Sequence, residues 1–346
     1  MRLTDSAACD LATRALLHAG VREDMAQDAA LMLTVTEMMG ITTHGLARLP
    51  NYIERVRAGG VNALADPVIT TVAPAVLHVD GQNGLGAAVA LRATRGAMQL
   101  AQTTGFAAAF CRRSSHMGAL APVLWEAVQG GFAAIITTNT APMIAPAGGR
   151  QPVLGNAPIG LAIPDASGAP VLLDMALSVA ARSKVRAASV AGQPIPETWA
   201  LDAQGHPTTD AAAAMQGMMQ AIGGAKGANL SLCLDLFAGG LSGAAMLSEI
   251  PNANLDPGAV ADVGHMILVL DPACLMPPDN FSTRLADARQ MVEGTPSVDP
   301  AAAVRMPGAR AVAALQKARS EGFKIAPELY EKLAKLAGWD VSLPLQ

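Results

Sequence analysis

The first sixty residues carry apolar side chains at the spacing of three and four that is typical of amphipathic helices. Helices are predicted here over residues 4–19, 22–39 and 44–59, and glycines follow or close each of them. The third helix shows the pattern most plainly. Its apolar stripe consists of Leu46, Leu49, Ile53 and Val56.

The middle of the chain has a different texture, in which short β-branched and apolar runs alternate with helical patterns. The strands predicted there cover residues 68–72, 75–79, 106–111, 132–138, 159–163, 171–174 and 263–270. The helices predicted between them cover residues 87–103, 117–128, 178–190 and 226–238. A helical tail is expected from about residue 279 to residue 338. The alternation predicts an α/β protein with a mixed central sheet and helical parts at both ends.

The same pattern suggests a division of the chain into two parts. Residues 1–70 and 279–346 would form a helical part for dimerisation and substrate binding, and residues 71–278 an α/β part for the cofactor. Gly81, Gly84 and Gly86 follow a predicted strand, but their spacing is not that of the dinucleotide-binding fingerprint. An ordinary Rossmann domain is therefore not supported.

Composition narrows the class of protein. Hydrophobic residues make up 51% of the chain and charged residues 15%, which indicates a compact protein with too few charges to cover a monomer's surface. A large subunit interface is expected. The net charge of −4, without a long basic run, argues against nucleic acid as a partner, because neutralising phosphates needs clustered Lys and Arg.

Other features bear on location. The N-terminus lacks the uninterrupted apolar run of a secretory signal. The most apolar long stretch, residues 230–247, contains Asp235, Ser242 and glycines, so it is interpreted as a buried helix and no membrane span is expected. The cysteines lie far apart, with neither disulfide nor metal spacing, as in a reduced cytoplasmic protein. They are Cys9, Cys111, Cys233 and Cys274.

Two histidines stand where a break leads into a predicted helix. Arg48 follows His44 by four residues, which would place both on one helical face, where they could receive a carboxylate and move a proton. The alternative is a helix start with a solvated arginine. His116 lies in the run RRSSHMG at a strand-to-helix junction, where it could serve as acid and base in carbonyl reduction or alcohol oxidation. The alternative there is an incidental histidine beside a capping serine.

Glycine-rich segments suggest a phosphate site. Residues 222–227, IGGAKG, precede a long apolar helix, and glycines, a lysine and a helix N-terminus together can hold a phosphate. Residues 174–178, DMALS, end a strand and open a helix, which also suits a cofactor loop. Each segment could equally be an ordinary loop.

Taken in order, these segments resemble the type-2 malate/L-lactate dehydrogenase family. The matching stretches include THGLARLPNYIERVRAGG, SSHMGA, LLDMALSVAARSK, GGAKGANLSLCLDLFAGGLSGA and RMPGAR, within residues 43–310. The resemblance implies a non-Rossmann fold, NAD or NADP as cofactor, no metal, and a homodimer with its active site near the interface. It implies a small anionic carboxylate as substrate.

The resemblance also assigns roles to residues. His116 would be the catalytic acid and base, and His44 a second candidate proton donor. Arg48 would hold the carboxylate, with Tyr52 and Thr43 in the same pocket; Thr43 replaces the family's usual serine but keeps the hydroxyl. The implied cofactor contacts are Thr140, Asp174, Met175, Ala176, Ser178, Lys226, Pro307 and Gly308.

Two departures and two alternatives remain open. Leu177 and Ala309 stand where the family usually has Thr and Glu, which leaves NAD and NADP both open. The predicted activity is hydride transfer between the nicotinamide and C2 of a 2-oxo or 2-hydroxy carboxylate. One alternative is reduction of a cyclic 2-imino carboxylate, and another is a non-catalytic dimeric binding protein with the same fold. The substrate, stereochemistry and direction are not specified by the sequence.

Overall fold

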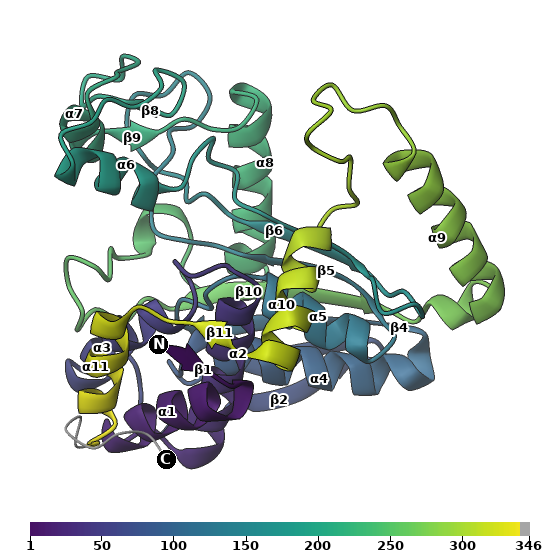
Figure 1. Cartoon of the computed structure of the whole chain (residues 1–346). Coiled ribbons are helices and arrows are strands. Elements are labelled where there is room, and N and C mark those ends of the chain that lie inside the picture. Colours follow the sequence, from purple (N-terminus) through teal and green to yellow (C-terminus); the bar gives the residue numbers. More distant parts are fainter. Residues whose placement is uncertain (340–346) are drawn as a thin grey trace.

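The computed structural model describes residues 1–339; residues 340–346, at the end of the predicted C-terminal helical part, lie outside the described residues (Figure 1). Its helices are α1 (Asp5–His18), α2 (Glu23–Met38), α3 (Leu49–Arg57), α4 (Gly86–Thr104), α5 (Ala121–Gln129), α6 (Arg182–Val190), α7 (Ala211–Gln216), α8 (Ala225–Asp235), α9 (Pro278–Glu293), α10 (Ala309–Glu321) and α11 (Pro327–Leu336). Its strands are β1 (Arg2–Leu3), β2 (Val68–Ala73), β3 (Val76–Asp80), β4 (Phe106–Ser114), β5 (Ala133–Thr138), β6 (Ile159–Ile163), β7 (Val171–Met175), β8 (Ala200–Leu201), β9 (Met218–Met219), β10 (Val263–Leu270) and β11 (Phe323–Lys324).

A mixed sheet forms the centre of the described chain, with the strand order β2-β3-β4-β10-β5-β6-β7. β3 and β4 run parallel, and the other neighbouring pairs of this sheet are antiparallel. β10 lies in the middle although it comes late in the sequence. Apart from His265 and a glycine its residues are apolar, and most of them are buried, which is typical of a strand covered on both faces. The predicted mixed α/β class without a Rossmann domain is confirmed.

Helices α4 and α5 cover one face of the sheet, and α2 packs against both of them. The buried residues of α4 are mostly alanines, whose small side chains let the helix lie close to β3, β4 and β10. Buried residues of the N-terminal helices and of α10 and α11 join the same core, which extends from Leu3 to Ala334. Within residues 1–339, none of the helices combines the length and the apolar character that crossing a membrane requires.

Two parts of the chain project from this core. Helices α6 and α7 with strands β8 and β9 form a small lobe that has an apolar cluster of its own (Figure 1). Helix α9 stands out on the other side of the sheet in the same view. In the described chain Leu285 is the one buried side chain of α9, and Arg289 joins the helix to Asp165 at 2.9 Å.

The structure shifts several predicted helix boundaries. The third helix begins at Leu49, not at residue 44, because residues 42–45 form a turn and Leu46–Arg48 a 3₁₀ turn before Pro50. The helix predicted from residue 117 begins at Ala121, since residues 115–120 form a loop. The helix predicted from residue 178 begins at Arg182. The short elements β8, β9 and α7 carry too few residues to show a period and were not predicted.

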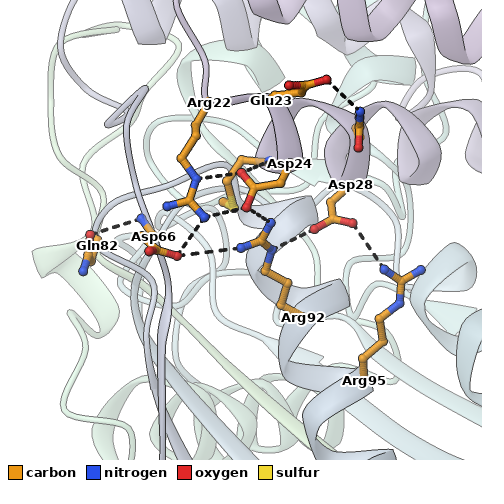
Figure 2. Close-up of polar contacts among 10 residues, drawn as sticks. Arg22, Glu23, Asp24, Asp28, Asp66, Gln82, Arg92 and Arg95 are labelled. Carbon is orange, nitrogen blue, oxygen red and sulfur yellow. Dashed lines mark hydrogen bonds and ion pairs between the residues drawn. The ribbon is translucent and has the colours of Figure 1, made fainter.

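An ion-pair network joins α2, α4 and the loop before β2 (Figure 2). Arg92 on α4 contacts Asp24 at 2.8 Å and Asp28 at 2.7 Å. Arg95 contacts Asp28 at 3.3 Å. Asp66 in the loop binds Arg22 at 2.9 Å. Because the Asp28 side chain is only 15% exposed, Arg92 and Arg95 take the place of water as partners of its carboxylate.

Replacing Arg92 with methionine should therefore lower the free energy of unfolding by about 1.5–3 kcal/mol, since hydrogen bonds to half-buried charges are lost. Chemical denaturation measures the effect. Arg14→Met is the matched control, because Arg14 pairs with Asp10 on an exposed surface and such pairs contribute at most about 1 kcal/mol. Equal losses in the two variants would contradict a stabilising role for the network.

Candidate active site

The two histidines singled out from the sequence lie against each other. The rings of His44 and His116 are stacked, with centroids 5.8 Å apart and planes inclined by 29°. The hydroxyl oxygen of Tyr52 lies 2.8 Å from Nδ1 of His116. The hydroxyl oxygen of Thr43 lies 3.0 Å from Nδ1 of His44. Both imidazoles are therefore oriented through Nδ1, and within residues 1–339 Nε2 of each ring is left for a ligand.

A buried carboxylate holds the turn that carries His44. Glu37 on α2 accepts a hydrogen bond from the backbone N–H of Leu46 at 2.9 Å. Gly45 lies so close to Glu37 that a side chain there would overlap its carboxylate. Nε of Arg48 donates to the carbonyl of Thr43 at 3.0 Å. Glu37 was not predicted as a site residue, although a lone acid at the apolar end of α2 is a usable signal.

A loop at residues 115–120 carries His116. The Ser115 hydroxyl accepts from the N–H of Gly86 and donates to the carbonyl of Gly84, both at 2.9 Å. A side chain at Gly86 would overlap the carbonyl of Ser115. Gly86 therefore allows close packing against this loop, a structural role that differs from that of a dinucleotide fingerprint.

A buried histidine supports the start of this loop. His265 on β10 lies 2.8 Å from the hydroxyl of Thr138 through Nδ1 and 2.8 Å from the hydroxyl of Ser114 through Nε2. Thr138 donates its own proton to the carbonyl of Gly264, so it accepts from Nδ1 of His265. His265 thus connects β4 with β5 and keeps no free nitrogen, as expected for a structural histidine.

Burial and one cation set the protonation of the pocket. The pKa of His116 lies well below its usual value, mainly because of burial and then because of Arg48 and His44. Burial, with Arg48, lowers the pKa of His44 to about 4. Burial raises the pKa of Tyr52 to about 12, against the opposing effect of nearby arginines. Near neutral pH both imidazoles are neutral and the phenol keeps its proton.

Arg48 acts on all three of these groups, so its charge lies close to them. Among the described residues, no carboxylate lies within ion-pair distance of Arg48. A neutral imidazole pair beside an uncompensated guanidinium is suited to bind an anion and to take a proton from it. Thr43, His44, Arg48, Tyr52 and His116 are thus brought together.

The predicted cofactor residues gather around β7, at the edge of the sheet. Asp174 accepts hydrogen bonds from the N–H groups of Leu120 and Ala121, each at 2.9 Å. Leu120 is the last residue of the His116 loop, and Ala121 is the first residue of α5. Asp174 therefore joins the predicted cofactor edge to the loop that carries His116.

The segment after β7 meets the glycine-rich turn before α8. Ser178 forms a bridge with Ala221, and the N–H of Ile222 donates to the carbonyl of Leu177 at 2.8 Å. Gly223 and Gly224 have φ values of +62° and +61°, which favour glycine. Lys226 is exposed in the first turn of α8. Within residues 1–339 the buried hydroxyl of Ser178 has no hydrogen-bond partner, which leaves it free for a ligand.

Pro307 and Gly308 flank the same strand, whereas Thr140 follows β5. The N–H of Leu172 donates to the carbonyl of Pro307 at 3.1 Å, and Gly308 packs against Leu172 with a φ of +81°. The hydroxyl of Thr140 is already engaged with Asn156, a residue that the sequence analysis missed. In the part of the chain that the structure describes, no group of three or more His, Cys, Asp and Glu side chains is arranged to hold a metal ion.

A sequence model of the malate/L-lactate dehydrogenase family matches residues 4–334. The chain belongs to this family. A (2R)-3-sulfolactate dehydrogenase (NADP(+)) of Chromohalobacter salexigens is 35% identical to this chain, over 94% of this chain and 95% of the relative. A Δ1-pyrroline-2-carboxylate/Δ1-piperideine-2-carboxylate reductase of Pseudomonas aeruginosa is 32% identical, over 97% and 99%.

Solved structures agree with this membership. The structure of the sulfolactate dehydrogenase of Methanocaldococcus jannaschii matches this chain with a TM-score of 0.89 and 28% sequence identity, over 99% of both chains. The Δ1-piperideine-2-carboxylate reductase of Pseudomonas syringae matches with a TM-score of 0.89 and 27% identity, over 97% of this chain and 99% of that one. The predicted family and the predicted oxidoreductase class are confirmed.

Proposed function

We propose that this oxidoreductase transfers a hydride between NAD or NADP and C2 of a small 2-oxo or 2-hydroxy carboxylate, with His116 as acid and base. The observation that carries the proposal is the neutral His116 imidazole, held by Tyr52 at 2.8 Å in a pocket that also receives the charge of Arg48. Relatives named for sulfolactate and malate support a small 2-hydroxy carboxylate as substrate.

The residues around β7 fit a nicotinamide dinucleotide. The unpartnered hydroxyl of Ser178, the left-handed glycine turn and the N-terminus of α8 with Lys226 suit a phosphate group. Asp174, Met175, Ala176, Thr140, Pro307 and Gly308 are the other residues proposed to hold the cofactor. When bound, the nicotinamide supplies or accepts the hydride. One relative is named for NADP(+), and comparing the two cofactors directly decides between them.

The chain's own residues provide binding and proton transfer. The substrate carboxylate pairs with Arg48, whose planar fork matches it. Nε2 of His116 faces the C2 oxygen, since Nδ1 is held by Tyr52. In oxidation the neutral ring takes the hydroxyl proton. In reduction, the bound carboxylate offsets the charge of Arg48, which raises the pKa of His116 and lets the ring carry a proton. His44 is the second candidate for this transfer.

The pH profile tests the electrostatics of this pocket. Because the pKa of His116 in the free protein lies well below its usual value, kcat/KM for oxidation should stay level as the pH falls from 8 through about 6.5, where an unperturbed imidazole protonates. Loss of activity is expected only at lower pH, as the basic form is titrated. A midpoint near pH 6.5 in stopped-flow measurements would contradict a buried, cation-flanked base.

A substrate panel tests the reaction. Oxaloacetate, pyruvate and 3-sulfopyruvate are compared with Δ1-pyrroline-2-carboxylate and Δ1-piperideine-2-carboxylate, using NADH and NADPH. The proposal expects the highest kcat/KM on a 2-oxo acid. Relatives named as Δ1-pyrroline-2-carboxylate reductases favour the cyclic imines as the second candidate. Activity on imines alone would replace the first proposal with the second.

We also propose a homodimer, with the active site near its interface. Ile135, Leu161 and Ile163 share the face of β5 and β6 opposite α5, and all three are exposed in the single chain. Leu236, Phe237 and Leu241 expose further apolar surface after α8. Exposed apolar side chains that gather in this way are typical of an interface that another subunit covers. The cytoplasmic location expected from the cysteine pattern stays a prediction.

Introducing charge into this face should separate the subunits. We expect Leu161→Arg/Ile163→Arg to elute as a monomer in size-exclusion chromatography with light scattering, while the unaltered protein elutes as a dimer. Val190→Arg is the control, because Val190 is 86% exposed and lies on α6, away from this face. The homodimer would be refuted if light scattering gave the unaltered protein the mass of a single chain.

A further inference from the structure

A cavity of about 420 Å³ opens over strands β2, β3 and β4, and its lining includes none of the residues assigned to the active site. His78 and Asp80 line it from β3, and Arg112 and Arg113 line it from β4. Asp80 and Arg112 are direct neighbours in the parallel ladder. Leu77 and Val79, which alternate with these residues, are buried toward α4, so the cavity lies on the opposite face of the sheet.

The cavity has more positive than negative charge. The guanidinium groups of Arg112 and Arg113 lie 3.3 and 3.2 Å from the same oxygen of Asp80. Asp262 accepts a hydrogen bond from the backbone N–H of Arg113, not from its guanidinium. In the described part of the chain, the buried Nε of Arg112 has no hydrogen-bond partner at all. Two cations thus share one carboxylate oxygen, and the Nε donor of Arg112 is left unused in the described part of the chain.

The two contacts between these arginines and Asp80 are longer than the shortest arginine–carboxylate contacts in this protein. Charge-assisted hydrogen bonds usually measure about 2.7–2.9 Å. Arg92 reaches this range with Asp28, at 2.7 Å, whereas both contacts with Asp80 are longer than 3.1 Å. A ligand oxygen with better geometry can therefore compete with Asp80 for the two arginines.

We propose that this cavity is a second ligand site, separate from the one around His116, and that it takes a small organic anion bearing a carboxylate or a phosphoryl group. Planar guanidinium forks bind both groups in a bidentate manner. The hydroxyl of Thr70 and the imidazole of His78, whose Nε2 lies 2.9 Å from the carbonyl oxygen of Ser242, add polar groups at the wall. The volume lies in the range of small-molecule sites and exceeds what an isolated inorganic ion needs.

Isothermal titration calorimetry tests the proposal with malonate and glycerol 3-phosphate as probes. The titrations use an Arg48→Gln background, so that binding at the active site is removed. One equivalent of at least one probe should bind per chain. Arg112→Gln/Arg113→Gln should weaken this binding by at least about tenfold, because two charge-assisted contacts are lost. The matched control Arg2→Gln/Arg14→Gln also removes two paired surface arginines and should leave the affinity unchanged.

The Asp80→Asn variant should change the affinity for the probe in the direction opposite to the double arginine variant. Removing the competing carboxylate should tighten probe binding several-fold, whereas damage to the fold would weaken it. This variant also keeps the proposal testable if the double arginine variant does not fold. The proposal is overturned if neither probe binds, if the double arginine variant binds as tightly as its control, or if Asp80→Asn weakens binding.

Discussion

Replacing His116 with alanine should lower kcat by about a hundredfold or more, because a positioned acid or base contributes about 10²–10⁴ to such a reaction. Nδ1 of His116 is held by Tyr52, and burial beside Arg48 keeps the ring neutral and able to accept a proton. The stacked His44 is 5.8 Å away between ring centres, so it cannot occupy the same position without moving. Steady-state kinetics in both directions measure the loss.

The control for this variant is His206→Ala, since His206 lies in an exposed turn after β8 and faces Asp202. Its kcat should match that of the unaltered protein. Binding of NADH or NADPH, followed by fluorescence, should survive in His116→Ala, because the residues proposed for the cofactor lie around β7. A kcat within a few-fold of the unaltered protein would remove His116 from the mechanism and leave His44 as the proton carrier.

Replacing Arg48 with lysine should raise KM by about tenfold to a hundredfold while kcat changes little, because lysine lacks the planar fork that pairs with a carboxylate. Lysine also cannot keep the hydrogen bond from Nε of Arg48 to the carbonyl of Thr43 in the same geometry. The turn that carries His44 would then be less firmly held. Initial rates over a range of substrate concentrations separate the two parameters.

Arg57→Lys is the matched control, because Arg57 lies in the last turn of α3 and its side chain is exposed. It removes a guanidinium from α3, the helix that follows the 3₁₀ turn of Arg48, without touching the pocket. An unchanged KM in Arg48→Lys would show that the substrate carboxylate is held elsewhere. A fall in kcat at constant KM would instead indicate that Arg48 acts mainly by positioning His44.

Local patterns predicted much of this fold because they reflect local physics. The apolar period in residues 4–39 and the β-branched runs of the middle correspond to helices and strands in the structure. The spacing of His44 and Arg48 was less informative than it looked. The two residues belong to a turn and a 3₁₀ turn, not to one α-helix, and they are held together by Thr43 and by Glu37 from α2.

Contacts between distant segments could not be obtained from such patterns. The pairing of Tyr52 with His116 depends on how α3 packs against the loop after β4, which no periodicity encodes. The contact of Asp174 with the start of α5 and that of Ser178 with Ala221 depend on the same kind of long-range packing. The resemblance to a family named these residues, but their mutual arrangement required coordinates.

Helix α9 buries far less of its surface than the central strands do. Leu285 is its one buried side chain among the described residues, whereas β10 lies in the middle of the sheet and most of its residues are buried. Local opening of α9 therefore breaks few apolar contacts, whereas opening of β10 exposes a strand whose side chains are mostly buried. Helix α9 is therefore expected to open locally at a lower free-energy cost than the strands that support the His116 loop.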